Sequence, residues 1–218
     1  MNRFEEDFLD YAGFGPAMQS KVVPSDKIAR FRGKLPDKLL EYWQTYGWCG
    51  YAKGLFWTVD PDEWEPALEA WIGDTPFMEQ DEYYVIARSA FGELYLWGRE
   101  SGDSLTIQPC YSKIYPNDCR GRLLKYGADK CLEVFFTSLH KEYMDFEDIN
   151  ETPLFERALS ALGKLDHNTL YGFVPALALG GLAKLENLQK LSAVEHLVIL
   201  AGLADRQIMM DIGKLARL

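Results

Sequence analysis

The sequence contains a long stretch without a single basic residue. No lysine, arginine or histidine occurs between Lys53 and Arg88, whereas nine acidic residues do. These are Asp60, Asp62, Glu63, Glu65, Glu69, Asp74, Glu79, Asp81 and Glu82. The 218-residue chain has a formal net charge of −10 and a pI of about 4.8. Because phosphate groups are held by clustered cations, this charge argues against direct binding of nucleic acid or anionic membranes and favours a basic protein as partner.

The motifs of the common enzyme classes are also missing. The chain has no GxxxxGK[ST] phosphate loop, no GxGxxG, no GxSxG nucleophile elbow and no HExxH zinc helix. No acid stands two residues before any lysine, so the DxK or ExK pair of one large nuclease class is absent. We therefore expect a protein that is not an enzyme and needs no cofactor. A hydrolase using His167 or His196 stays open as a third option, in which a His→Ala substitution would abolish activity without unfolding the chain.

Few residues are spaced to bind a metal. The four cysteines never occur at CxxC spacing; they are Cys49, Cys110, Cys119 and Cys131. This spacing fits free thiols in a reducing cytoplasm better than a disulfide framework or a zinc site. Asp60, Asp62 and Glu63 could bind a divalent cation through oxygen, but capping of a following helix explains them more simply. We expect no metal site.

Signals for export or membrane insertion are lacking. No apolar run reaches the roughly 18 residues that indicate a membrane span. The N-terminal segment MNRFEEDFLDY is acidic and has neither the basic flank nor the apolar core of a signal peptide. With 48% hydrophobic and 26% charged residues, the composition is that of an ordinary globular protein. We expect a bacterial cytoplasmic protein with no membrane partner.

Hydrophobic periodicity and turn residues predict an α+β fold. The expected helices cover residues 4–11, 36–46, 61–72, 128–140, 153–162 and 193–203. The expected strands cover residues 55–59, 83–87, 93–98, 104–108, 113–115 and 208–212. Short connections between successive strands indicate an antiparallel meander. We predict helices around a small, mostly antiparallel sheet in residues 1–145, followed by a smaller, mainly helical domain in residues 146–218, although the two parts could pack as one unit.

Local signals add detail to this outline. Asp60 and Thr152 are each followed by a proline, and both are expected to cap the helix that follows. The segment from Leu35 to Glu82 is densely aromatic, which predicts that it forms much of the core. Three of its aromatic residues are expected to reach the surface, where an aromatic side chain beside acids is a typical interface anchor. These are Trp48, Tyr51 and Trp64.

Two segments resemble known families. LPDKLLEYWQTYGWCGYAKGLFWTVDPDEW, from Leu35 to Trp64, resembles the signature of GAD-like domains: a proline-led helix, a glycine-aromatic turn, GLFW and an acid-proline helix start. LYGFVPALALGGLAKLENLQKLSAVEHLVIL, from Leu170 to Leu200, resembles the small C-terminal domain of immunity proteins for type VI secretion DNase toxins (Tde/Tdi type). The first segment also has a fainter similarity to SUKH-type immunity domains.

The resemblance implies an immunity protein, a non-enzymatic binder that neutralises a cognate secreted DNase through a basic surface of the toxin. It supplies no contact residues, since we interpret Tyr171, Gly172, Pro175, Gly180 and Gly181 as residues of the scaffold. The toxin-binding surface is therefore expected on the acidic runs and one neighbouring aromatic. Its candidate residues are Asp60, Asp62, Glu63, Trp64, Glu65, Glu69, Asp74, Glu79, Asp81, Glu82, Glu147 and Asp148.

An alternative function belongs to another class. An aromatic pocket near Trp43, Trp48 and Trp57 could bind a small molecule or a peptide as a sensing module. Ligand-dependent thermal stabilisation in the absence of any protein partner would distinguish this alternative from an immunity protein.

Overall fold

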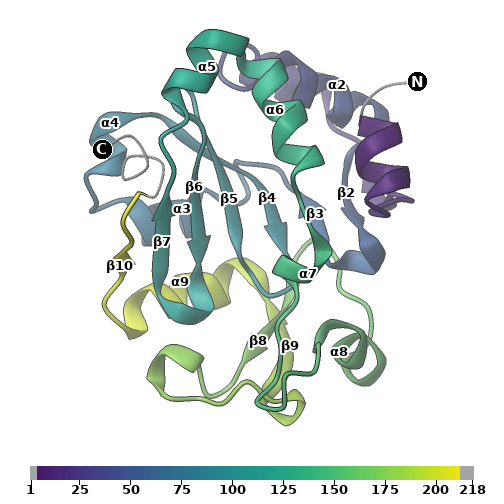
Figure 1. Ribbon diagram of the computed structural model, residues 1–218, viewed down its shortest axis with the longest axis vertical. Helices are drawn as coiled ribbons and strands as arrows, with labels where there is room; N and C mark the ends of the chain where they lie inside the picture. The colour runs from purple at the N-terminus through teal and green to yellow at the C-terminus, as the bar shows by residue number, and fades with distance from the viewer. Residues whose placement is uncertain (1–3, 212–218) are drawn as a thin grey trace.

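A twisted, mainly antiparallel sheet forms the centre of the computed structural model, which describes residues 4–211 (Figure 1). Within these residues the sheet has eight strands in the order β1-β2-β3-β4-β5-β6-β7-β10. Their bounds are β1 Met18–Lys21, β2 Trp48–Tyr51, β3 Phe56–Thr58, β4 Tyr83–Ser89, β5 Leu94–Gly98, β6 Gly102–Gln108, β7 Lys113–Pro116 and β10 Gln207–Ile208. All neighbours are antiparallel except β7 and β10, which run parallel.

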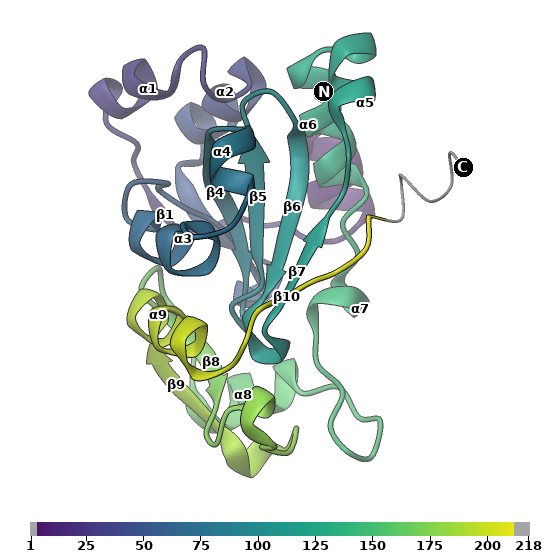
Figure 2. The same ribbon diagram turned by 90° about the vertical axis from the view of Figure 1, so that its left-hand side faces the viewer.

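Helices cover both faces of this sheet. Figure 2 shows α6 on one side and α3 with α9 on the other. The α-helices are α1 Ser25–Phe31, α2 Asp37–Tyr46, α3 Glu65–Ile72, α4 Phe77–Gln80, α5 Arg120–Tyr126, α6 Ala128–Thr137, α7 Lys141–Met144, α8 Phe155–Leu162 and α9 Ala193–Leu203. Shorter or irregular turns are the π-helix η1 Phe4–Tyr11 and the 3-10 turns η2 Ala52–Gly54, η3 Pro109–Tyr111, η4 Leu177–Leu179 and η5 Leu185–Asn187. The predicted α+β class and antiparallel meander are confirmed.

The predicted helix after Pro36 is confirmed as α2. Its apolar face carries Leu39, Leu40 and Trp43, all buried, because these positions recur at helical spacing. The helix ends at Gly47, whose φ of +74° favours glycine. A Cβ at Gly47 would lie 2.5 Å from the Lys21 carbonyl oxygen, so the close approach of β1 also requires glycine there.

The aromatic segment forms the core more completely than the sequence indicated. Trp48, Tyr51 and Trp64, which were expected to reach the surface, are at most 2% exposed. Tyr51 lies against Phe4 and Phe8 of η1. Burying the aromatic rings removes a large apolar area from water. The free energy gained in this way is larger than that of leaving their polar groups in contact with solvent.

The two predicted proline-linked caps are wrong, and the helices start later. Residues Pro61–Trp64 form a turn in which Asp60 Oδ1 accepts a hydrogen bond of 3.0 Å from the Asp62 amide, so α3 begins only at Glu65. Helix α8 begins at Phe155, and its first amide groups donate to the carboxylate of Asp145 rather than to Thr152. A side chain ten residues upstream therefore satisfies the helix end, which local spacing cannot reveal.

The C-terminal segment differs in part from the prediction. The helix opening at Ser192 is confirmed as α9; the Ser192 hydroxyl donates to the Glu195 carboxylate, and no side-chain hydrogen bond from Ser192 caps a backbone amide. Two strands for which the sequence analysis gave no prediction also lie in this segment: β8 (Thr169–Phe173) pairs antiparallel with β9 (Leu188–Ser192). Of the strand expected at 208–212, residue 212 lies outside the described residues. The observed strand β10 extends the central sheet.

The N- and C-terminal parts meet at a buried guanidinium group. Arg88 of β4 is 0% exposed, and its guanidinium carbon lies 5.0 Å from the Trp57 ring centroid and 5.5 Å from that of Trp64. Its NH2 group donates to the Asp166 carbonyl at 2.7 Å, while NH1 donates to the carbonyl of Ser89 at 3.2 Å. Burial lowers the pKa of Arg88. Arg88 thus joins the sheet to the chain preceding β8.

A second set of contacts joins the same two parts. Trp71 Nε1 of α3 donates to the Leu197 carbonyl of α9 at 3.0 Å. Arg206 donates to the Ala70 and Trp71 carbonyls at 2.9 and 3.1 Å. The division into domains at residue 145 stays a prediction.

Replacing Arg88 should destabilise the whole chain. Arg88→Met keeps much of the side-chain volume but removes the guanidinium donors to the Asp166 and Ser89 carbonyls, so we expect a loss of about 3 kcal/mol in the free energy of unfolding. Arg88→Lys should recover little, because an ammonium group lacks the planar fork that contacts both rings. Urea unfolding measures both variants, and an unchanged midpoint for Arg88→Met would contradict this role.

The capping of α8 by Asp145 can be tested against the cap that the sequence suggested. Asp145→Ala removes the acceptor for the Leu154 and Phe155 amides and should cost about 1–2 kcal/mol of stability. Thr152→Ala should cost less than about 0.5 kcal/mol, because the exposed Thr152 side chain does not cap the helix. Thermal or urea unfolding of both variants would reject the assignment if their order were reversed.

Candidate functional site

Several of the candidate toxin-binding acids form ion pairs within the chain. Asp60, only 4% exposed, pairs with Lys27 of α1 at 2.9 Å, and Lys27 also contacts Asp62. Arg30 NH2 lies 2.9 Å from Asp62 Oδ1. Both carboxylates therefore serve to fix α1 against the turn that precedes α3.

Other cations from outside the acidic run neutralise more of it. Lys21 lies 2.6 Å from Glu63, and Arg206 lies 2.6 Å from Asp74. Glu82 is paired with Lys34 at 3.0 Å and with Arg99 at 3.6 Å. The absence of bases between Lys53 and Arg88 is thus compensated by segments that lie far away in sequence.

Hydrogen bonds account for further candidates. Tyr84 and Lys34 donate to Glu82, and these bonds hold the pKa of Glu82 below its usual value. Asp81 accepts from the backbone amide of Glu100 at 3.0 Å and therefore holds the turn after β5.

In the second acidic run, Arg157 lies 2.6 Å from Asp148, which is buried. The hydrogen bond from Arg157 keeps the pKa of Asp148 low. Trp64 is buried beneath Arg88. Asp148 and Trp64 therefore support the fold.

Four candidates remain exposed and form no ion pair with any described residue: Glu65, Glu69, Glu79 and Glu147. Glu65 and Glu69 are one turn apart on α3, so they share its solvent face. Glu79 lies on the short helix α4, and Glu147 follows α7, which Figure 2 shows on the opposite side of the sheet. The twelve candidates therefore do not form one continuous surface.

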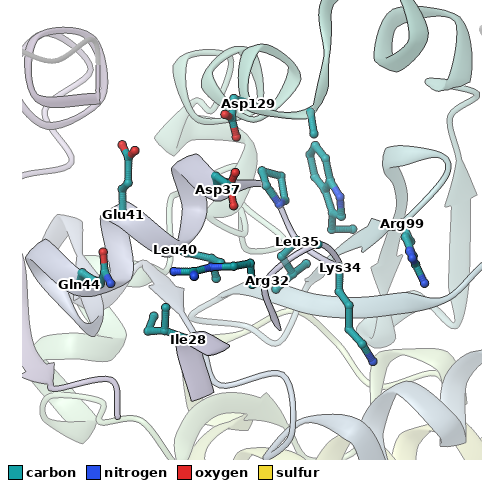
Figure 3. A pocket seen from close by; sticks show the side chains of 14 residues that line it. Ile28, Arg32, Lys34, Leu35, Asp37, Leu40, Glu41, Gln44, Arg99 and Asp129 are labelled. Carbon is teal, nitrogen blue, oxygen red and sulfur yellow. The ribbon is translucent and has the colours of Figure 1, made fainter. Parts of the chain in front are cut away.

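A cleft of about 690 Å³ lies beside α2, at the junction with the end of β5 and the start of α6 (Figure 3). Leu35, Leu40 and Trp97 supply its apolar part. Cations and anions both line it, and Lys34 and Arg99 are already paired with Glu82. Because both signs of charge are present, the cleft has no electrostatic preference for a cationic or an anionic ligand. Sequence reasoning missed it because its residues come from three separate segments.

The aromatic pocket expected near Trp43, Trp48 and Trp57 is filled by the core. All three side chains are at most 2% exposed, and Trp43 packs edge-on against Trp48 with centroids 5.6 Å apart. Trp57 Nε1 donates to the Gly54 carbonyl at 2.8 Å. This position therefore offers no open binding space.

The histidines considered for catalysis have structural contacts. His167 Nε2 lies 2.6 Å from the Gln19 carbonyl oxygen, and its ring packs edge-on against Trp57. Burial lowers the pKa of His196, whose ring lies so close to Gly172 that a Cβ there would clash at 2.5 Å. Residues 4–211 contain no group of three or more His, Cys, Asp or Glu placed to hold a metal ion. In the same range, every helix is too short or too polar to span a membrane.

Each of the two parts of the chain is similar to a known protein family. Residues 4–111 match the family model of the GAD-like domain, and residues 129–204 match that of the type VI secretion system (T6SS) immunity protein Tdi1, C-terminal. The fold resembles the crystal structure of Atu4351 from Agrobacterium tumefaciens, with a TM-score of 0.81 and 20% sequence identity over 94% of this chain and 91% of that one. No curated protein matches the sequence. The two family models match in order along one polypeptide, and the second match supports assignment of the chain as a type VI secretion immunity protein.

Proposed function

We propose that this immunity protein neutralises a DNase toxin by binding it stoichiometrically in the cytoplasm, without catalysis. The match of residues 129–204 to the Tdi1 C-terminal family carries this proposal. The net charge of −10 supports it, because nuclease active sites are lined with cations that hold phosphate. An acidic protein surface can occupy such a site and exclude DNA. The four buried, unpaired thiols suit a reducing compartment.

We place the main electrostatic contact on the solvent face of α3. Glu65 and Glu69 are exposed there, and neither pairs with another described residue. Their charge therefore extends into solvent, whereas the charges of Asp60 and Asp62 are offset by Lys27 and Arg30. A standard interface buries on the order of 1,600 Å², so α3 would form only part of the contact.

Co-expression with the toxin encoded beside this gene tests the proposed function directly. Cells that produce the toxin should survive only when this chain is present, and the pair should elute as a stoichiometric complex. DNA cleavage by the purified toxin should stop at one equivalent of the immunity protein. Death of the co-expressing cells, with no complex recovered, would refute the proposal.

Charge reversal on α3 should change the kinetics of binding. Glu65→Lys combined with Glu69→Lys removes negative charge that attracts the toxin, so we expect an association rate about ten-fold lower at low salt and a weaker salt dependence. Stopped-flow or surface-plasmon measurements at several ionic strengths provide the test.

The matched control for this variant is Glu6→Lys combined with Glu186→Lys. Both residues are exposed and lie outside α3, and the substitutions change the net charge by the same amount. This control should keep most of the wild-type rate. Equal rates for the α3 variant and the wild type would place the electrostatic contact elsewhere on the protein.

A further inference from the structure

A second cavity, of about 350 Å³, lies on the α7 side of the sheet, and Figure 1 shows α7 near the lower end of the strands. Aromatic rings form much of its wall. Phe146 stacks on Tyr111 with centroids 5.6 Å apart and also contacts Phe91 at 5.0 Å. Tyr143 of α7 lines the same cavity and is 80% exposed, so its ring is accessible to a partner. The cavity volume is near the lower end of the range of about 300–1,000 Å³ for ligand sites.

All of the charged residues that line this cavity are acids. They are Glu93, Glu142, Asp145 and Glu147, and no described lysine, arginine or histidine lines it. Asp145 is already engaged as the cap of α8. One cation approaches from outside: Lys113 Nζ lies 5.7 Å from the Tyr111 ring centroid, but it pairs with none of these acids. Lys53, Lys141 and Lys164 line an adjoining cavity together with Glu142, Asp145 and Glu147, whereas Glu93 forms no ion pair with any described cation.

Glu93 is a strongly shielded acid of this cavity, and only neutral side chains bind its carboxylate. It stands just before β5, and the β5–β6 register places it opposite Gln108, on the same face as the buried Tyr95. The Tyr95 hydroxyl donates to its carboxylate at 3.2 Å and the Gln108 amide does so at 3.3 Å; both donors are neutral. Burial raises the pKa of Glu93 to about 7. A shielded carboxylate with only neutral donors destabilises the folded protein, so its presence points to a use outside folding.

We propose that this cavity binds the guanidinium group of an arginine side chain from the bound toxin, with Glu93 as its carboxylate partner and Tyr111 and Tyr143 as its aromatic walls. The inference rests on the proposed function and adds to it a second contact, on the side of the sheet opposite α3. Arginine fits better than lysine, because a planar guanidinium can pair with a carboxylate through two donors while its face stacks on an aromatic ring. A guest cation would also offset the cost of holding the Glu93 charge.

The first test measures the affinity of the toxin complex with Glu93→Gln. The amide keeps the size of the side chain but removes the charge that would pair with the guanidinium, and we expect at least ten-fold weaker binding. Glu186→Gln, the same change at an exposed site outside the cavity, should bind within two-fold of wild type.

The folding of Glu93→Gln can be monitored in the same samples. Because an acid whose pKa is raised on folding destabilises the native state once it is ionised, Glu93→Gln should raise the midpoint of urea unfolding at pH 8. Weaker binding therefore could not be attributed to unfolding. Tyr143→Ala, at a site 80% exposed, is a second variant that spares the core and should also weaken the complex several-fold.

The toxin side of the contact can be found by a double-mutant cycle. Among Arg→Met variants of the toxin, one should lose affinity with the wild-type chain but lose little more when it is combined with Glu93→Gln. If Glu93→Gln binds the toxin as tightly as wild type, the cavity is not the arginine site, while the immunity function stands. Absence of any complex with the wild-type chain would instead refute the proposed function, and this contact with it.

A free small molecule that carries a guanidinium group could occupy the same cavity in place of a toxin side chain. N-acetyl-arginine methylamide, titrated into the toxin-free protein and followed by amide chemical shifts, should bind only at millimolar concentration and should not bind Glu93→Gln. Micromolar binding of this probe would make a free small molecule the occupant and would overturn the assignment to a toxin side chain.

Discussion

The buried guanidinium of Arg88 is the interaction on which the joining of the two halves depends. A charged group without a carboxylate partner is costly to bury unless its donors are satisfied and its faces contact polarisable rings. Here carbonyl oxygens from β4 and from the chain before β8 accept from the two terminal nitrogens, Nε has no hydrogen-bond partner among the described residues, and two tryptophans of the GAD-like part provide the rings. The Tdi1-type segment is thus attached through its backbone at this point, while Phe146, Tyr171 and Phe173 pack their rings against Phe91.

Electrostatic compensation inside the chain changes the meaning of its acidic composition. The run between Lys53 and Arg88 is uninterrupted in sequence, yet Lys21, Lys27, Lys34 and Arg206 bring cations to it in space. What remains for a partner is a small number of unpaired carboxylates on separate faces. Net charge therefore sets the long-range attraction between partners, whereas the position of each unpaired acid determines the specific contact.

The fold could be predicted from the sequence wherever the signal was local. Helix α2 between Pro36 and Gly47 followed from residue spacing and its two terminal residues, and the meander β4–β7 followed from alternation and short turns. The start of α8 could not be predicted, because its amides are satisfied by Asp145, which lies across a loop. Local capping rules assume a neighbouring acceptor, and here tertiary structure supplied a different one.

For the candidate site, the sequence predicted the type of residue involved but not which of these residues are exposed. The sequence identified the acids, but it could not distinguish Asp60, which holds α1, from Glu65, which faces solvent, because their partners are distant in sequence. Trp64 was misplaced for the same reason, since the guanidinium that covers it comes from β4. The sequence did not identify Glu93 as a candidate, because a single acid before a strand indicates no binding site. Its position opposite Gln108 follows only from the pairing of β5 with β6.

The parallel pairing of β10 with β7 has a consequence for the order in which the protein matures. Until Gln207 and Ile208 are in place, β7 is an uncovered edge of the sheet, with backbone groups free to pair with another chain. Because β10 lies far downstream of β7 in the chain, a nascent chain carries this exposed edge from the synthesis of β7 until β10 has been made. Termination between β7 and residue 207 would leave a sheet edge prone to aggregation, so β10 protects an edge that every such shorter product exposes.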